Sequence, residues 1–64
     1  MRNLIVEWDL DTAQWIVREE GQKAPIAAAD TQEEAIADAR TLRGSAGGQI
    51  KVRQLNGQWS DASE

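Results

Sequence analysis

The 64-residue chain contains no cysteine and no histidine. Without cysteine it can form no disulfide, so nothing in the sequence indicates a secreted, oxidising environment. Zinc sites built from cysteine and histidine are excluded, and so are Ser-His-Asp and Cys-His catalysis. We therefore expect a protein that is not an enzyme and holds no cofactor or metal, so that its function depends on surface contacts.

Large aromatic residues are scarce as well, because the chain has no Phe or Tyr and only three Trp. A chain of this length buries only about 60% of the surface that its unfolded form exposes. We expect one domain over residues 1–64 with a thin core. Small domains often need a disulfide, a metal or a second subunit for stability. Because the chain lacks cysteine and histidine, we expect self-association to be the source of added stability.

No run of large apolar residues is longer than three, and the first ten residues lack the apolar stretch and cleavage site of a signal peptide. We expect no membrane-spanning segment and a cytoplasmic location. The net charge of −4 argues against non-specific binding to nucleic acid. It does not exclude a specific contact.

Alternating apolar residues predict two strands at the start of the chain, over 3–8 and 14–19. The short turn Asp9–Thr12 between them predicts an antiparallel hairpin. In residues 24–29, Pro25 cannot donate a hydrogen bond to a neighbouring strand, so this segment is at best a short edge strand. Further strands are expected over 49–55 and 58–61, joined by Asn56-Gly57, which is typical of a type I′ turn.

A helix is expected over 32–43, because Thr31-Gln32-Glu33-Glu34 has the pattern of a capping box. Its apolar side is expected to consist of Ala35, Ile36, Ala39 and Leu42. The alanines in this stripe would let the helix lie close to the sheet. The predicted fold is an α+β two-layer sandwich with an antiparallel sheet, one helix on one face, and the order β-β-(β)-α-β-β.

Three segments of this sequence resemble a family of short bacterial proteins known as a domain of unknown function. They are Trp15–Gly21 (W-I-V-R-E-E-G), the helix start T-Q-E-E-A-I at 31–36, and G-G-Q-I-K-V at 47–52. This resemblance implies a fold but no activity and no catalytic residues. A weaker similarity, over Glu7–Val17 and Asp30–Ala35, is to HicB-like antitoxins, which would imply a toxin as the partner and often an added DNA-binding segment.

The alternation in each strand assigns residues to the two faces of the sheet. Trp8 and Trp15 are expected beneath the helix. Trp59 is assigned to the core too, with the surface as the alternative, because a turn at Asn56-Gly57 pairs it with the polar Gln54. The opposite face is expected to lie open and to serve as the candidate partner surface. Its candidate contact residues are Ile5, Ile16, Arg18, Lys51, Arg53 and Leu55.

Three other motifs have simple structural explanations. Asp9-x-Asp11 lacks the further ligands of a calcium loop and is expected to form a turn. The acidic residues Glu33, Glu34 and Asp38 are expected to face solvent. The glycines after the helix, Gly44, Gly47 and Gly48, stand on the wrong side of it for a phosphate cradle.

The function expected from these features is a small non-catalytic interaction module, with a homodimer through the open sheet face as one form of it. The alternative is an antitoxin-like or regulatory protein that binds a toxin or a nucleic-acid-associated partner. Direct contact with nucleic acid through Arg18, Lys51 and Arg53 is disfavoured, because no aromatic residue is expected among them.

Overall fold

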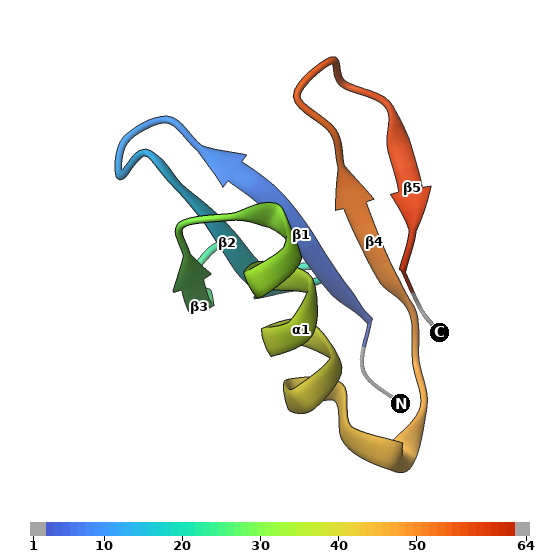
Figure 1. Ribbon diagram of the computed structural model, residues 1–64. Helices are drawn as coiled ribbons and strands as arrows, with labels where there is room; N and C mark the ends of the chain where they lie inside the picture. The colour runs from blue at the N-terminus through green and yellow to red at the C-terminus, as the bar shows by residue number, and fades with distance from the viewer. Residues whose placement is uncertain (1–2, 63–64) are drawn as a thin grey trace.

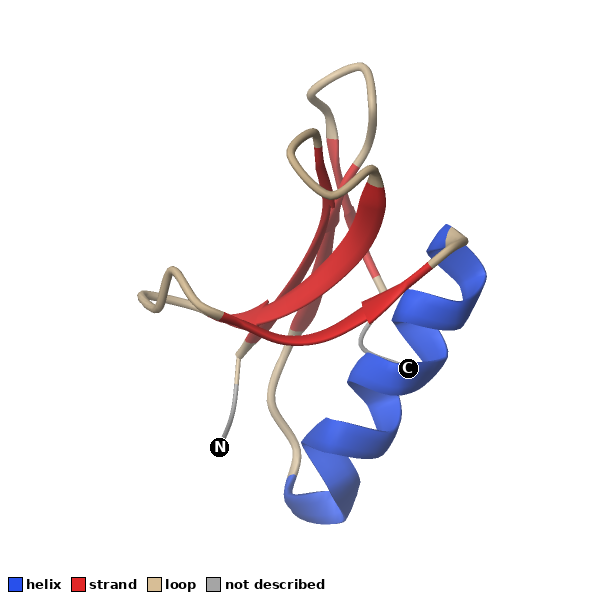
Figure 2. Ribbon diagram, turned by 90° about the vertical axis from the view of Figure 1, so that its left-hand side faces the viewer, coloured by secondary structure: helices blue, strands red, loops and turns tan. Residues whose placement is uncertain are grey.

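In the computed structural model, which describes residues 3–62, a five-stranded sheet carries one helix on one face (Figures 1 and 2). Figure 2 shows the helix on one side of the sheet and no element on the other side. The predicted small α+β fold is confirmed. The elements are β1 (Leu4–Asp9), β2 (Gln14–Glu19), β3 (Pro25–Ala29), α1 (Gln32–Arg43), the 3₁₀ turn η1 (Gly44–Ala46), β4 (Ile50–Arg53) and β5 (Trp59–Asp61).

The order of the strands across the sheet is β3-β2-β1-β4-β5. Three of the four pairings are antiparallel, but β1 and β4 are parallel, so the prediction of a fully antiparallel sheet is wrong at this pairing. After the β1-β2-β3 meander, α1 crosses the sheet and returns the chain to the free edge of β1. A strand that follows such a crossover runs parallel to the strand that it joins. Local sequence does not show which edge of the β1-β2-β3 sheet β4 will pair with.

The helix α1 begins and ends with favourable caps. At its N-terminus the Glu34 backbone N–H donates to the Thr31 hydroxyl at 3.2 Å. At its C-terminus Gly44 has φ 68° and donates its backbone N–H to the Arg40 carbonyl. Acidic residues occupy the first turn and basic residues the last, as the helix dipole favours. These local interactions define the ends of the helix, whereas packing on the sheet stabilises it.

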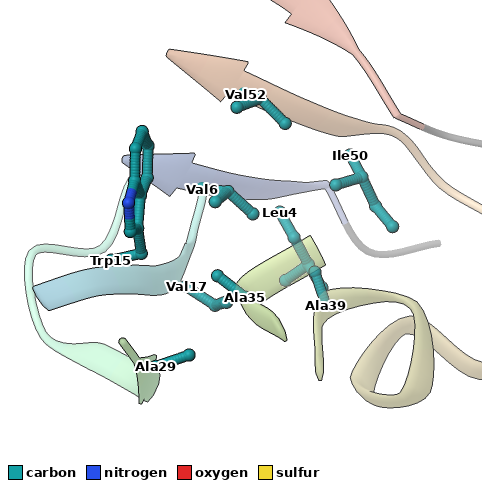
Figure 3. Close-up of a cluster of buried hydrophobic side chains, with 9 residues drawn as sticks. All are labelled: Leu4, Val6, Trp15, Val17, Ala29, Ala35, Ala39, Ile50 and Val52. Atoms are coloured by element: carbon teal, nitrogen blue, oxygen red, sulfur yellow. The ribbon is translucent and has the colours of Figure 1, made fainter. Parts of the chain in front are cut away.

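The core lies between α1 and the sheet (Figure 3). Leu4 and Val6 of β1 and Val17 of β2 point toward the helix, where Ala35 and Ala39 are fully buried. This confirms the predicted alternation in the first two strands. The alanines let the helix backbone approach the sheet closely. The buried cluster comprises Leu4, Val6, Trp15, Val17, Ala29, Ala35, Ala39, Ile50 and Val52.

Enlarging Ala39 tests this close approach. We expect Ala39→Leu to destabilise the protein by about 1–3 kcal/mol, because the added carbons must displace the helix or its neighbours. Urea unfolding followed by circular dichroism measures the change. Ala37→Leu is the matched control, since Ala37 is exposed on the same helix. Equal stability of the two variants would contradict this view of the packing.

Candidate functional site

The face of the sheet opposite α1 is the candidate functional surface. The strand registers decide which side chains lie on it, because successive residues of a strand point to opposite faces. Within residues 3–62, no helix or strand covers this face (Figure 2). The residues that the registers place there include Ile5, Glu7, Ile16, Arg18, Lys51, Arg53, Trp59 and Asp61.

The centre of this face is closed by its own side chains. Ile5 and Ile16 are each only 7% exposed, so neither is available as a contact residue. An ion pair links Glu7 and Arg18, with Arg18 Nε 2.6 Å from Glu7 Oε2. The Arg18 guanidinium also donates to the Gln22 carbonyl at 3.2 Å. The predicted residues Ile5, Ile16 and Arg18 do lie on this face, but they form its closed centre.

Leu55 does not lie in the strand that the sequence predicts for it. The strand β4 ends at Arg53, and Leu55 is in the following loop with 74% of its surface exposed. The Gly57 N–H donates to the Gln54 carbonyl at 2.9 Å, and the Gln54 N–H donates to the Gln58 carbonyl at 2.7 Å. The loop therefore contains three residues, 55–57, and continues neither strand.

The type I′ turn predicted for Asn56-Gly57 is also wrong. That turn requires positive φ at both residues, whereas Gly57 has φ 88° and Asn56 is not among the residues with positive φ. A three-residue loop closed by a residue with positive φ is the next most common hairpin connection. The Asn56 side chain supports it by accepting the Gln58 N–H at 3.0 Å.

The longer loop moves Trp59 to the open face. A two-residue turn would pair Trp59 with Gln54, but the observed partner of Trp59 is Arg53. A change of one residue in register moves a side chain to the other face of the sheet. Trp59 is 53% exposed, so the prediction that it belongs to the core is wrong. The open face thus has an aromatic residue, which the alternation in the sequence does not predict there.

We define the Trp59 patch as Lys51, Arg53, Leu55 and Trp59. All four are exposed, and all belong to the β4–β5 hairpin. Arg53 is the cross-strand partner of Trp59, and Lys51 is the cross-strand partner of Asp61. The exposed apolar and cationic groups of the open face are therefore concentrated toward the β5 edge.

A shallow hollow lies on either side of the Trp59 patch. One is lined by Ile5, Lys51 and Trp59, with acidic groups from Glu20 and Asp61. The other is a notch where β1 and β4 diverge after their paired residues 4–6 and 50–52 (Figure 1). Its walls include Trp8, Leu10, Arg53 and Leu55. A bound segment could therefore place one side chain on each side of Arg53.

The described residues offer no obvious place for a metal ion or a membrane span. Residues 3–62 contain no group of three or more acidic side chains arranged to hold a metal. In the Asp9–Thr12 turn, the Asp9 carboxylate accepts the Asp11 N–H at 3.0 Å and the Thr12 hydroxyl at 3.2 Å. The helix in this part of the chain is too short to cross a bilayer.

The sequence model of one family, described as an uncharacterized protein conserved in bacteria (DUF2188), matches residues 6–64. The chain belongs to this family. The expected resemblance to a bacterial domain of unknown function is thereby confirmed. Neither the curated proteins nor the solved structures gave a match. The DUF2188 match spans the Trp59 patch and the closed centre from Glu7 onward, but it assigns no role to any residue.

Proposed function

We propose that this DUF2188 protein is a non-catalytic interaction module that binds another protein through the Trp59 patch. The observation that carries the proposal is the pairing of a half-exposed Trp59 with an exposed Arg53 on a face whose centre is closed. Tryptophan and arginine are enriched at the energetic centres of protein interfaces. An exposed pair of this kind is better explained by an intermolecular contact than by the fold.

The chemistry of the patch indicates what the partner presents. The Trp59 indole offers a large apolar surface, which an aliphatic or aromatic side chain would cover. Arg53 forms no ion pair within residues 3–62, and its planar guanidinium suits a carboxylate that accepts two hydrogen bonds. The partner is thus a protein segment that carries an acidic residue beside an apolar one.

A second copy packed face to face, the homodimer predicted from the sequence, fits this surface less well. It would cover the Glu7–Arg18 ion pair and remove it from water, and desolvation of such a pair opposes binding. It would gain little from Ile5 and Ile16, because both are already buried. A partner that sits toward the β5 edge avoids this cost and still covers Trp59.

We propose no catalytic role because of the reactive side chains that the chain contains. Neither Cys nor His occurs in the chain, so nucleophilic and acid–base chemistry would depend on carboxylates and lysines. The hollows beside the patch are open to solvent, where these groups gain little from their surroundings. Binding needs only the exposed apolar and cationic groups that are present.

Quantitative capture of a partner with variants of the patch tests the proposal. The tagged protein is mixed with an extract of its native bacterium, and the affinity of the captured partner is then measured for wild type, Trp59→Ser and Arg53→Glu. We expect Trp59→Ser to weaken binding by about 30-fold or more, the loss typical of a hot-spot residue. Arg53→Glu should also weaken it, by reversing the charge beside the indole.

Ile26→Ser is the matched control, because Ile26 is an exposed apolar residue but lies on β3, at the opposite edge of the sheet from the patch. It should change the affinity by less than about threefold. Equal affinities for wild type and Trp59→Ser would overturn the proposal. The proposal would also be overturned if the only property lost in Trp59→Ser were self-association, or salt-sensitive binding to nucleic acid. Either result would show that the patch binds a second copy or a nucleic acid and not another protein.

A further inference from the structure

The notch between β1 and β4 lies where the parallel pairing of these two strands stops. Their register ends at the pair Val6–Val52, although β1 continues to Asp9 and β4 to Arg53. Figure 1 shows the two strands diverging beyond this pair. The volume of the notch is about 430 Å³, many times that of a water molecule, about 30 Å³. It can therefore hold a side chain of a bound segment.

The backbone groups of Trp8 point into this notch. Hydrogen bonds of an antiparallel strand alternate in direction from one residue to the next. The Glu20 N–H donates to the Asn3 carbonyl at 2.9 Å, so the odd-numbered residues of β1 bond to β2. The Leu4 N–H donates to the Gln49 carbonyl at 2.8 Å, so the even-numbered residues bond toward β4. The β1–β2 register is regular as far as Asp9, which places the Trp8 N–H and C=O on the β4 side.

The hydrogen bond that would close the notch is not formed. The Val6–Val52 pair implies that the Arg53 N–H donates to the Val6 carbonyl. The next bond of the ladder would join the Trp8 N–H to the Arg53 carbonyl, and it would pair Glu7 with Arg53. The register contains no such pair, and no other group in residues 3–62 accepts the Trp8 N–H. A donor and an acceptor thus face each other across the notch.

A group that binds between them must accept one hydrogen bond and donate another. Lysine and arginine side chains only donate, ionised carboxylates only accept, and a hydroxyl does both through a single oxygen. A carboxamide has its donor and its acceptor on separate atoms, so it can span a gap that is too wide for one hydrogen bond. The chain's own Gln54 is engaged elsewhere, because its side chain is bonded to Gln32 at 2.9 Å and to Ser60 at 2.7 Å.

The walls of the notch suit the aliphatic part of such a side chain. Trp8, Leu10 and Leu55 line it, and Leu10 and Leu55 are 85% and 74% exposed. Methylene groups placed between them would remove apolar surface from water. Glutamine has two methylene groups where asparagine has one, so glutamine would cover more of these walls.

We infer that the notch binds the carboxamide of a glutamine from a partner protein, which accepts the Trp8 N–H and donates to the Arg53 carbonyl. The inference rests on the proposed function, because this glutamine belongs to the segment that covers the Trp59 patch. Arg53 connects the two sites, since its side chain lies on the patch and its carbonyl faces the notch. The partner segment therefore combines a glutamine with an acidic residue and an apolar one.

Hydrogen exchange of the free protein, followed by NMR, tests the open ladder. We expect the Trp8 N–H to have a protection factor at least about tenfold lower than those of Val6 and Glu7. The Val6 N–H is bonded to β4 and the Glu7 N–H to β2, whereas only water can accept the Trp8 N–H. Protection of Trp8 equal to that of Val6 would overturn the inference, because the notch would then be closed.

Selection of random peptides displayed on phage tests the glutamine. Peptides that bind wild type and lose affinity for Trp59→Ser are expected to share a glutamine near an acidic residue. Replacing that glutamine with methionine keeps the length of the side chain but removes both hydrogen bonds. We expect this change to weaken binding by about fivefold or more.

The outcomes of the selection distinguish this inference from the proposed function. Peptides that depend on Trp59 but bind equally well with methionine would overturn the inference and leave the proposed function standing. A selection that yields no peptide dependent on Trp59 would count against the proposed function itself, and the inference would fail with it.

Chemical synthesis of the 64-residue chain provides a measurement at the Trp8 N–H. An ester in place of the amide between Glu7 and Trp8 removes this N–H and keeps both side chains. We expect the ester to weaken the glutamine peptide by about threefold or more and to leave the methionine peptide unaffected, while circular dichroism shows the fold intact. An equal loss for both peptides would show that the carboxamide does not bind the Trp8 N–H.

Discussion

Replacing Trp15 with alanine is expected to leave about half of the molecules unfolded at 25 °C. Trp15 is only 8% exposed, and its ring meets that of Trp8 edge to face with centroids 5.8 Å apart. Truncating a buried tryptophan to alanine costs about 3–5 kcal/mol. A single core in a chain of this length rarely supplies more than about 3–5 kcal/mol of stability. The substitution therefore removes about as much stability as the protein has.

Circular dichroism with urea titration measures this effect, and Trp59→Ala is the matched control. Trp59 is half exposed and its removal should change the free energy of unfolding by no more than about 0.5 kcal/mol. The two variants remove the same side chain from the two faces of the sheet. A cooperative unfolding transition near that of wild type for Trp15→Ala would show that the core does not depend on this residue.

Ile16→Glu is the second substitution with a large expected effect. From the sequence, Ile16 is an exposed contact residue on the open face, and a charge there would disturb only binding. In the structure Ile16 is 7% exposed and directly opposite Glu7. The new carboxylate would lose the burial of isoleucine and lie beside a like charge. We expect a loss of about 3 kcal/mol or more in the free energy of unfolding.

Two further variants at this position separate the causes. Ile16→Val should cost only about 0.5–1.5 kcal/mol, because it deletes one carbon. Ile16→Gln matches glutamate in shape without the charge, so it should lie between valine and glutamate. Urea unfolding of the three variants gives the order. If Ile16→Glu were as stable as wild type, the closed centre of the open face would be an incorrect description.

The same argument separates folding residues from binding residues on the open face. Ile5, Ile16 and the Glu7–Arg18 pair contribute to stability, so their substitution confounds any binding assay. Lys51, Arg53 and Trp59 are exposed at the β5 side and can be changed with little effect on the fold. Experiments on partners should therefore use the Trp59 patch.

Some features of the fold follow from local sequence. The Thr31 cap and the terminal charges define α1, and the alternation in residues 4–8 and 15–17 assigns Trp8 and Trp15 to the helix side. Each of these depends on residues within a few positions of one another. Local hydrogen bonds and the two-residue period of a strand are enough to determine them.

The sequence by itself thus determined the α+β class, the capped helix, the buried face of the first hairpin, and the absence of cysteine and histidine chemistry. The tertiary structure decided that β4 pairs in parallel with β1, that the hairpin loop has three residues, and that Trp59 lies outside the core. It also decided that Ile5 and Ile16 are covered by their neighbours. The reason is that register, edge choice and burial depend on segments far apart in the chain, and a shift of a single residue moves a side chain from the core to the surface.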